Sequence, residues 1–412
     1  MTLSKNVTYL DNTSRQQTTN WMLFVGIILI SSNLRAPLTS VGALITFIRD
    51  DLGISNTLAG SLTTLPLLAF ALFSPFVPKI AARIGMELTI FIALGLLTIG
   101  IIVRSLFGVG PLFIGTTFVG LGIAIGNVLL PAFIKMNFPL KVGIMTGIYG
   151  ISMNIFGALG AGLSVPFSSI SGLGWQGALG IWALLSFIAC LIWMPQLSKR
   201  QETIEVDDSP TTGNIWRSSL AWFITIFMGL QSLVFYTLMT WIPDILQTLG
   251  YSSSAAGWLL FLMQFSIIPI TFIMPLLAEK MRHQIALSVM TASLLIVGIM
   301  TLIVGHTFFI PVAMILIGVG CGSAFSLSMM FFTLRTSDGK QAAEISGMAQ
   351  SFGYLLAATG PVLFGALHDM NGGWTLPLSM LIIIAFIILI AGIEAGKDRV
   401  ISRIPKQEKG AF

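Results

Sequence analysis

Long apolar runs dominate this sequence and limit the folds open to it. Twelve such runs follow one another along the 412-residue chain, and about 20 apolar residues are what an α-helix needs to cross the hydrocarbon of a bilayer. Lipid offers no partner to a free backbone amide, so each run must be helical. The runs are continuously apolar rather than alternating, which excludes a β-barrel. The sequence predicts helices at 21–48, 57–79, 87–106, 109–134, 142–166, 174–196, 217–246, 255–278, 284–304, 309–334, 342–367 and 373–395.

Charged residues are scarce over the whole chain. Asp, Glu, Lys and Arg make up 9% of the chain, against about 25% in a soluble protein. This composition excludes a soluble globular protein, a disordered chain and a disulfide scaffold. The net charge of +5 is spread over many short loops, so we expect no nucleic-acid partner. The first apolar run is too long for a signal-peptide core and is predicted to remain as a span.

One polar and acidic stretch divides the chain. Residues 197–216 form the only linker-like break, and six apolar runs lie on each side of it. The sequence therefore predicts an all-α membrane protein made of two six-helix bundles. The predicted units are a cytoplasmic tail at 1–20, an N-terminal bundle at 21–196, a cytoplasmic linker at 197–216, a C-terminal bundle at 217–395 and a second cytoplasmic tail at 396–412.

Lysine and arginine indicate the orientation of the chain in the membrane. With the N-terminus in the cytoplasm, 18 of the 21 Lys and Arg residues fall on the inner side, and only Arg49 and Arg104 fall in outer loops. Cytoplasmic loops of membrane proteins carry such an excess. An even number of spans returns the chain to the side on which it began. We therefore expect a multi-pass protein of the cell membrane with both termini in the cytoplasm.

The two halves of the chain repeat each other weakly. Residues 52–60 lie 197 positions before residues 249–257, and five of these nine aligned positions are identical. Pro78 and Pro275 match at the same offset. Because each repeat holds an even number of spans, the halves are expected to be related by a pseudo-twofold axis along the membrane normal. Such a duplication predicts a cavity between the bundles that opens to each side in turn.

Arg35 is the strongest candidate for a functional residue. It lies 14 positions after Trp21 and 13 before Ile48, which is too deep for its side chain to reach a membrane surface at about 1.5 Å per residue. A charge at this depth faces protein or water rather than lipid. Two interpretations stay open. The planar guanidinium can bind a small oxyanion or nitro group, or it can hold backbone carbonyls around a kink at Pro37.

Other polar side chains also lie deep in the predicted spans. Ser31 and Thr39 stand four residues before and after Arg35, so the three are expected to share one helix face along the cavity. Asn154 and Tyr354 correspond in the repeat and are expected to face each other. The alternative for each residue is a hydrogen bond between helices. The full set of predicted solute-binding residues is Arg35, Ser31, Thr39, Asn127, Asn154, Gln231, Tyr236, Gln350 and Tyr354.

The sequence lacks the residue groups that enzymes use. No Asp or Glu lies in the middle of a predicted span, the three histidines stand apart, and the two cysteines lie in apolar runs. We therefore expect no enzyme, no metal and no cofactor. No phosphate-binding glycine motif is present, so ATP is not the direct energy source. The missing deep carboxylate favours uniport or solute exchange over proton symport.

The plan of six plus six spans resembles the major facilitator superfamily over essentially the whole chain. Residues 78–87 resemble the loop motif of that superfamily between its second and third spans. Arg83 and Gly85 match the motif, whereas Ala82 stands at its Asp position. The resemblance implies a gating loop that contains Arg83 and Gly85 but lacks the Asp contact.

Further segments resemble one branch, the cyanate/nitroimidazole transporter family. They are Asn-Leu-Arg-Ala-Pro at 33–37, Gly-Asn-Val-Leu-Leu-Pro at 126–131, Gly-Leu-Gln-Ser at 229–232 with Phe-Tyr at 235–236, and Ser-Gly-Met-Ala-Gln at 346–350 with Gly-Tyr-Leu-Leu at 353–356. The resemblance implies a secondary active or facilitative transporter that moves a small polar or anionic solute, such as a cyanate-like anion or a nitro compound, by alternating access. The alternatives are a multidrug-type exporter of small aromatic drugs, and a channel or solute sensor. The expected partners are the solute and the lipid bilayer, and a bundle of this size can work as a monomer.

Overall fold

The structure is a computed structural model of the 412-residue chain. It describes residues 21–54, 56–106, 108–170, 172–199 and 215–401. The predicted tail at 1–20, most of the predicted linker and the end of the second predicted tail lie outside the described residues.

The described residues are helical almost throughout, and they contain no strand. The first helix covers residues 21–33. The following α-helices are α2 (Ala36–Leu52), α3 (Asn56–Phe73), α4 (Val77–Ile84), α5 (Met86–Arg104), α6 (Val109–Asn137), α7 (Val142–Ser168), α8 (Gly174–Gly180), α9 (Trp182–Trp193), α10 (Ser219–Thr248), α11 (Ser253–Lys280), α12 (Ile285–Val304), α13 (Ile310–Leu334), α14 (Gly339–Asn371) and α15 (Thr375–Gly396). The short 3-10 helices are η1 (Met194–Lys199), η2 (Ile215–Arg217) and η3 (Thr307–Phe309).

The predicted spans match this pattern. Within the described ranges, eleven helical segments are long and apolar enough to cross a bilayer, and α3 with α4 makes a twelfth if that bent pair is one span. Each segment falls on one of the apolar runs of the sequence. The predicted fold class is therefore confirmed: the protein is an all-α, multi-pass membrane protein.

The first two spans are interrupted. Residues 34–35 form a turn between the first helix and α2, and Pro37 stands in the first turn of α2, where it has no amide hydrogen to continue the helix before it. The second span bends by 61° between α3 and α4. Broken helices at membrane depth are tolerated where the freed backbone is buried in protein or lines a cavity. The first break is the place where Arg35 lies.

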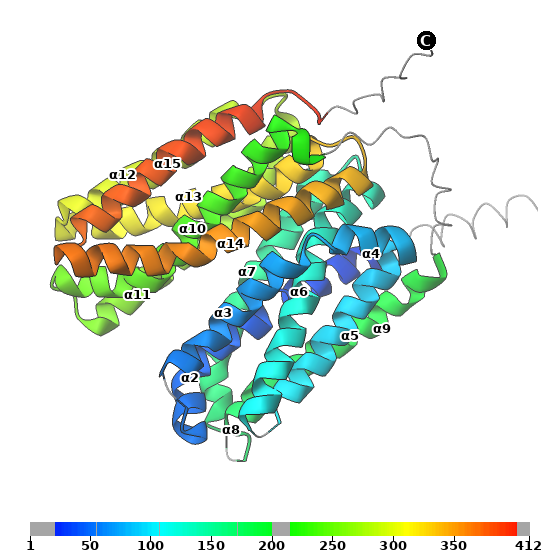
Figure 1. Ribbon diagram of the computed structural model, residues 1–412, viewed down its shortest axis with the longest axis horizontal. Helices are drawn as coiled ribbons and strands as arrows, with labels where there is room; N and C mark the ends of the chain where they lie inside the picture. Colours follow the sequence, from blue (N-terminus) through cyan, green and yellow to red (C-terminus); the bar gives the residue numbers. More distant parts are fainter. Residues whose placement is uncertain (1–20, 55, 107, 171, 200–214, 402–412) are drawn as a thin grey trace, which may run out of the picture.

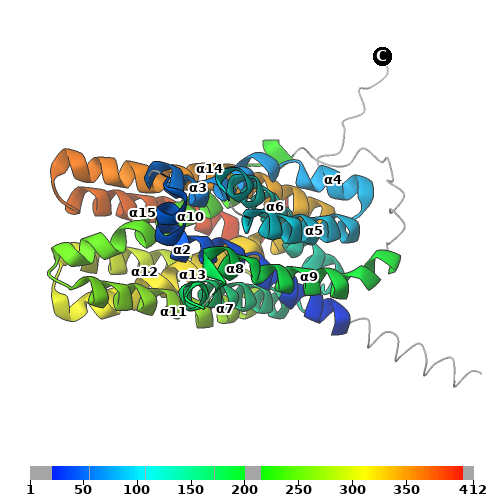
Figure 2. The same cartoon turned by 90° about the horizontal axis from the view of Figure 1, so that it is seen from below.

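The helices gather into two bundles, α2–α9 and α10–α15 (Figure 1). The bundles lie together at the end of the molecule where α9 finishes and α10 starts, which we call the linker end. Figure 2 shows α4, α5 and α9 reaching this end together. The bundles diverge towards the opposite end, which we call the far end, where α14 ends at Asn371 before α15 (Figure 1). Whether the two predicted units fold independently stays a prediction.

Polar contacts join the two halves at the linker end. Lys135, close to the end of α6, donates from Nζ to the carbonyl oxygen of Thr333 at 2.6 Å and to Oγ1 of Thr336 at 2.8 Å. Thr333 and Thr336 lie at and just beyond the end of α13. On another pair of helices, the hydroxyl of Ser351 in α14 donates to the carbonyl of Ala71 in α3. The halves therefore share hydrogen bonds at this end.

Glycines bring helices of the two halves into close contact. A Cβ atom added at Gly143 of α7 would lie 2.7 Å from the carbonyl oxygen of Pro275 in α11, and one added at Gly147 would lie 2.9 Å from the Phe272 ring. Small residues let helix backbones approach one another inside a membrane. α7 therefore packs directly against α11 at the linker end.

Candidate functional site

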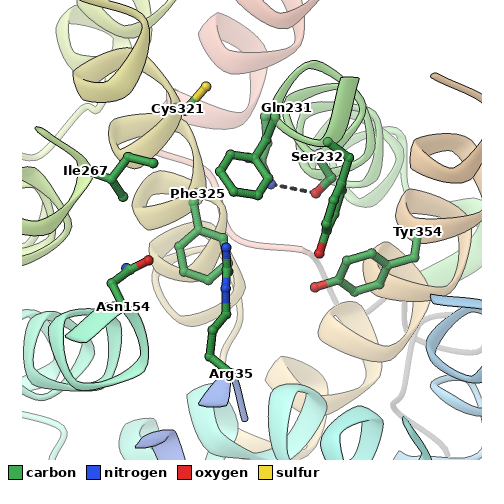
Figure 3. Close-up of a pocket in the computed structure, with 10 residues that line it drawn as sticks. Arg35, Asn154, Gln231, Ser232, Ile267, Cys321, Phe325 and Tyr354 are labelled. Carbon is green, nitrogen blue, oxygen red and sulfur yellow. Dashed lines mark hydrogen bonds between the residues drawn. The ribbon is translucent and has the colours of Figure 1, made fainter. Parts of the chain in front are cut away.

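A pocket lies between the two bundles, near the middle of α10. It encloses about 420 Å³ when its open mouth is included, and Figure 3 shows the side chains that surround it. Two of its lining residues come from the N-terminal half and eight from the C-terminal half. The ten are Arg35, Asn154, Gln231, Ser232, Phe235, Tyr236, Ile267, Cys321, Phe325 and Tyr354.

Arg35 enters this pocket from the break in the first span (Figure 3). Its aliphatic stem rests on α7, where a Cβ added at Gly157 would lie 2.6 Å from Cγ of Arg35. Its Cζ lies 5.3 Å from the centroid of the Phe235 ring, within the range of a cation–π contact. Among the described residues, no hydrogen bond or ion pair joins the guanidinium to an acceptor. Its donors therefore remain available to a bound solute.

A second arginine, Arg104, has the role that one of the two interpretations assigned to Arg35, which is to hold a backbone carbonyl at the Pro37 kink. Nη1 of Arg104 donates to the carbonyl oxygen of Pro37 at 2.7 Å, so the carbonyl at the kink is held by Arg104. The side chain of Arg104 is fully buried. The expectation that Arg104 lies in an outer loop is therefore wrong. In the sequence, Arg104 stands near the end of an apolar run. The sequence alone does not show that α2 and α6 cover its side chain.

The three residues of the predicted polar face, Ser31, Arg35 and Thr39, do not all line the pocket. The turn at residues 34–35 follows Ser31, whereas Arg35 and Thr39 both lie against Gly157 of α7. Ser31 is buried and donates to the carbonyl of Ile27 at 2.5 Å. Thr39 donates to the carbonyl of Gly157 at 2.8 Å. Of the three residues, Arg35 alone is among those that line the pocket.

Four other predicted residues meet Arg35 at the pocket. Asn154 comes from α7, and Gln231, Tyr236 and Tyr354 come from the opposite half. Asn154 also donates to the carbonyl of Gly150 at 2.9 Å within its own helix. Gln231 donates from Nε2 to the hydroxyl of Ser232 at 2.8 Å (Figure 3). Asn154 and Tyr354, the pair related by the repeat, thus line one pocket from its two sides.

Asn127 and Gln350 lie outside this group. Gln350 of α14 donates to the backbone carbonyl of Asn127 at 2.9 Å and to the hydroxyl of Ser346 at 2.8 Å. The side chain of Asn127 accepts a hydrogen bond from the hydroxyl of Tyr149 at 3.2 Å. These contacts correspond to the alternative of hydrogen bonds between helices, and the contact of Gln350 joins the two halves.

Sequence reasoning missed five of the lining residues. They are Ser232, Phe235, Ile267, Cys321 and Phe325. Helical spacing gives a signal for two of them, because Gln231, Ser232, Phe235 and Tyr236 stand on neighbouring positions of one face of α10. No comparable signal marks the other three, which are ordinary members of apolar runs.

The predicted gating loop lies at the linker end. Gly85 separates α4 from α5 and has a φ of 90°, a conformation that glycine adopts without the strain of a side chain. Arg83 is exposed in the last turn of α4. Neither residue lies at the pocket, so a gating role for them stays a prediction.

The pocket combines one cation with neutral donors and aromatic faces. Arg35 is the only Asp, Glu, Lys, Arg or His among the ten lining residues. Over the described part of the chain, no three His, Cys, Asp or Glu side chains come together as a metal site. A guanidinium can donate to two oxygens at once, and aromatic rings cover the faces of a planar group. The pocket is therefore suited to bind a small planar group that carries negative charge or electron-rich oxygens.

Comparisons with known proteins agree with this architecture. The sequence profile described as Major Facilitator Superfamily matches residues 23–361. An uncharacterised transporter of Bacillus subtilis, YycB, is 45% identical over 95% of this chain and 98% of its own. The 2-nitroimidazole transporter of Escherichia coli is 41% identical over 92% of this chain and 96% of its own. The cyanate transport protein CynX of Escherichia coli is 26% identical over 86% and 91%.

A solved structure shows the same fold. The proton:xylose symporter XylE superimposes with a TM-score of 0.72 at 13% identity, covering 95% of this chain and 98% of its own. The resemblances seen in the sequence, to the superfamily and to its cyanate/nitroimidazole branch, are thus confirmed. The chain belongs to the Major Facilitator Superfamily, in the branch that includes the 2-nitroimidazole transporter, and it is a membrane transporter of small solutes rather than an enzyme.

Proposed function

We propose that this protein moves a small planar solute, either a cyanate-like anion or a nitro compound, across the cell membrane by alternating access. The transport is secondary active or facilitative, and the linker end and both termini face the cytoplasm. The observation that carries the proposal is the guanidinium of Arg35, which reaches the pocket without an acceptor among the described residues. A solute with negative charge or electron-rich oxygens supplies that acceptor.

The lining of the pocket supports a planar solute. Phe235, Tyr236, Phe325 and Tyr354 give the pocket that Arg35 enters an aromatic lining, and the Phe235 ring lies under the guanidinium. Such rings stack on flat groups and cover them from water. Gln231 and Asn154 add amide groups from opposite halves of the protein. A solute that contacts both amides would bridge the two bundles, which is what alternating access requires of a substrate.

The names of two relatives agree with this chemistry. One is a 2-nitroimidazole transporter and one is a cyanate transport protein. Nitro and cyanate groups are both small and present electron-rich atoms to a donor. Export of small nitro-aromatic compounds would use the same pocket in the opposite direction, and the aromatic lining favours that alternative over export of large aliphatic drugs.

Uptake into proteoliposomes tests the proposal. Labelled 2-nitroimidazole and labelled cyanate are supplied to wild type, to Arg35→Ala and to Arg49→Ala. Arg49 serves as the matched control because it lies on the same span near the far end, partly exposed beside Asp50. We expect saturable uptake of at least one probe, a loss of about 10-fold to 100-fold in Arg35→Ala because a charge-assisted hydrogen bond is removed, and wild-type uptake in Arg49→Ala.

Equal uptake by wild type and Arg35→Ala would contradict the site. Uptake that rises in proportion to solute concentration without saturation would favour a channel over a transporter.

A further inference from the structure

Arg104 carries a second guanidinium inside the N-terminal bundle, and it is not among the residues that line the pocket. It is the last residue of α5 and is fully buried. Only its Nη1 has a hydrogen-bond partner among the described residues, because Nε and Nη2 have none. A buried charge with donors left unpaired is costly to the folded state. We therefore look for the role of Arg104 in its single hydrogen bond, to the carbonyl oxygen of Pro37.

That bond acts on the backbone that carries Arg35. Pro37 stands two residues after Arg35, on the far side of the turn at residues 34–35. Because the helix is interrupted there, regular helical hydrogen bonds do not fix the direction of α2 relative to the first helix. Contacts from neighbouring helices must do so.

Two neighbouring helices supply those contacts. From α5, Arg104 donates to the carbonyl of Pro37 at 2.7 Å. From α7, the carbonyl of Gly157 accepts from Thr39 at 2.8 Å, and Gly160 lies so close that an added Cβ would be 2.6 Å from the carbonyl oxygen of Ala36. Arg104 is the only charged group in this set, so its bond is the strongest of these hydrogen bonds.

We propose that Arg104 is a positioning residue, which holds the start of α2 so that the guanidinium of Arg35 reaches the Phe235 ring and the solute. Arg104 touches no solute itself. This inference rests on the proposed function of the pocket, since it concerns how Arg35 is presented there. It assigns the two deep arginines different tasks in one site.

A double-mutant cycle on the purified full-length protein tests this role. The variants are Arg35→Lys, Arg104→Met and the combination of these two, with Arg35→Ala measured alongside and Arg49→Met as the matched control. The measurement is the dissociation constant of 2-nitroimidazole and, in parallel, of cyanate. Arg35→Lys keeps a positive charge, so that weak binding remains measurable. The melting midpoint of each variant is recorded to separate binding from loss of structure.

We expect Arg104→Met to weaken binding about 5-fold to 10-fold, as loss of one charge-assisted hydrogen bond allows. If Arg104 acts through Arg35, the double variant binds within about 2-fold of Arg35→Lys alone, because the two changes affect one contact. A residue with a purely structural role would instead give losses that multiply.

Three results would overturn the inference. The first is multiplied losses in the double variant, and the second is wild-type binding by Arg104→Met. The third is wild-type binding by both single variants at position 35, Arg35→Lys and Arg35→Ala. Only the third would also overturn the proposed function. If Arg104→Met fails to fold, Arg104→Lys takes its place in the same cycle. It retains a donor for the carbonyl of Pro37, so we then expect Arg104→Lys alone to weaken binding less than Arg104→Met would. Added to Arg35→Lys, it should weaken binding no further, and multiplied losses would again contradict the role.

Discussion

Arg35 and Arg104 lie in the same bundle, yet the protein surrounds them differently. Arg104 is completely buried, and its guanidinium donates to a backbone carbonyl. Arg35 is half-buried at a pocket, and its guanidinium lies over an aromatic ring without an acceptor among the described residues. The difference teaches that depth alone does not make an arginine available to a ligand. An arginine that lies at an open pocket and lacks a protein acceptor has donors left for a solute.

Each arginine also packs against a glycine, and these contacts differ in kind. A Cβ added at Gly115 of α6 would lie 2.3 Å from the backbone nitrogen of Arg104, so the obstacle there is backbone. The atoms nearest to a Cβ added at Gly157 of α7 belong to the side chain of Arg35, with Cγ at 2.6 Å. A backbone cannot move without disturbing its helix, whereas a side chain can turn away. Alanine at these two glycines should therefore harm different properties.

The largest effect is expected for Gly115→Ala. The added methyl group forces α5 and α6 apart, and overpacking of this kind costs roughly 1–3 kcal/mol of stability. The melting midpoint of the purified protein should fall by several degrees. Gly110→Ala is the matched control on the same helix, because nothing lies within 4 Å of an added Cβ there. A Gly115→Ala protein as stable as Gly110→Ala would contradict the close packing around Arg104.

A smaller effect, on binding rather than stability, is expected for Gly157→Ala. The methyl group displaces the stem of Arg35 and turns its guanidinium away from the pocket. The affinity for 2-nitroimidazole, measured by calorimetry, should fall about 10-fold, because the contact to a charged group is lost. Gly162→Ala on the same helix has open space around its added Cβ and should bind as wild type. Unchanged affinity in Gly157→Ala would show that this glycine does not set the position of Arg35.

Much of the fold could be predicted from the sequence, because lipid imposes a simple rule. Every apolar run long enough to cross the bilayer has to be a helix, so the runs gave the spans to within a few residues. The repeat pointed to two halves with a site between them. The rule does not say where a span breaks or which of its polar residues reach the pocket, and Ser31 and Thr39 do not line it with Arg35.

The site was harder to predict because its members depend on packing between distant helices. Arg35 stood out because a charge in an apolar run is costly. Phe325 and Cys321 carry no such signal, and only the approach of α13 brings them to the pocket. Arg104 looked like a loop residue for the same reason, since its burial depends on α2 and α6 rather than on its own surroundings in the sequence.

The most direct test of the central claim varies both the solute and the protein. The dissociation constants of 2-nitroimidazole and of imidazole are measured for wild type and Arg35→Ala, at a pH well above the pKa of the imidazolium cation. If Arg35 binds the electron-rich group, wild type prefers the nitro compound by about 10-fold or more, and Arg35→Ala binds the two compounds about equally. A variant that keeps the full preference of the wild type would contradict the account.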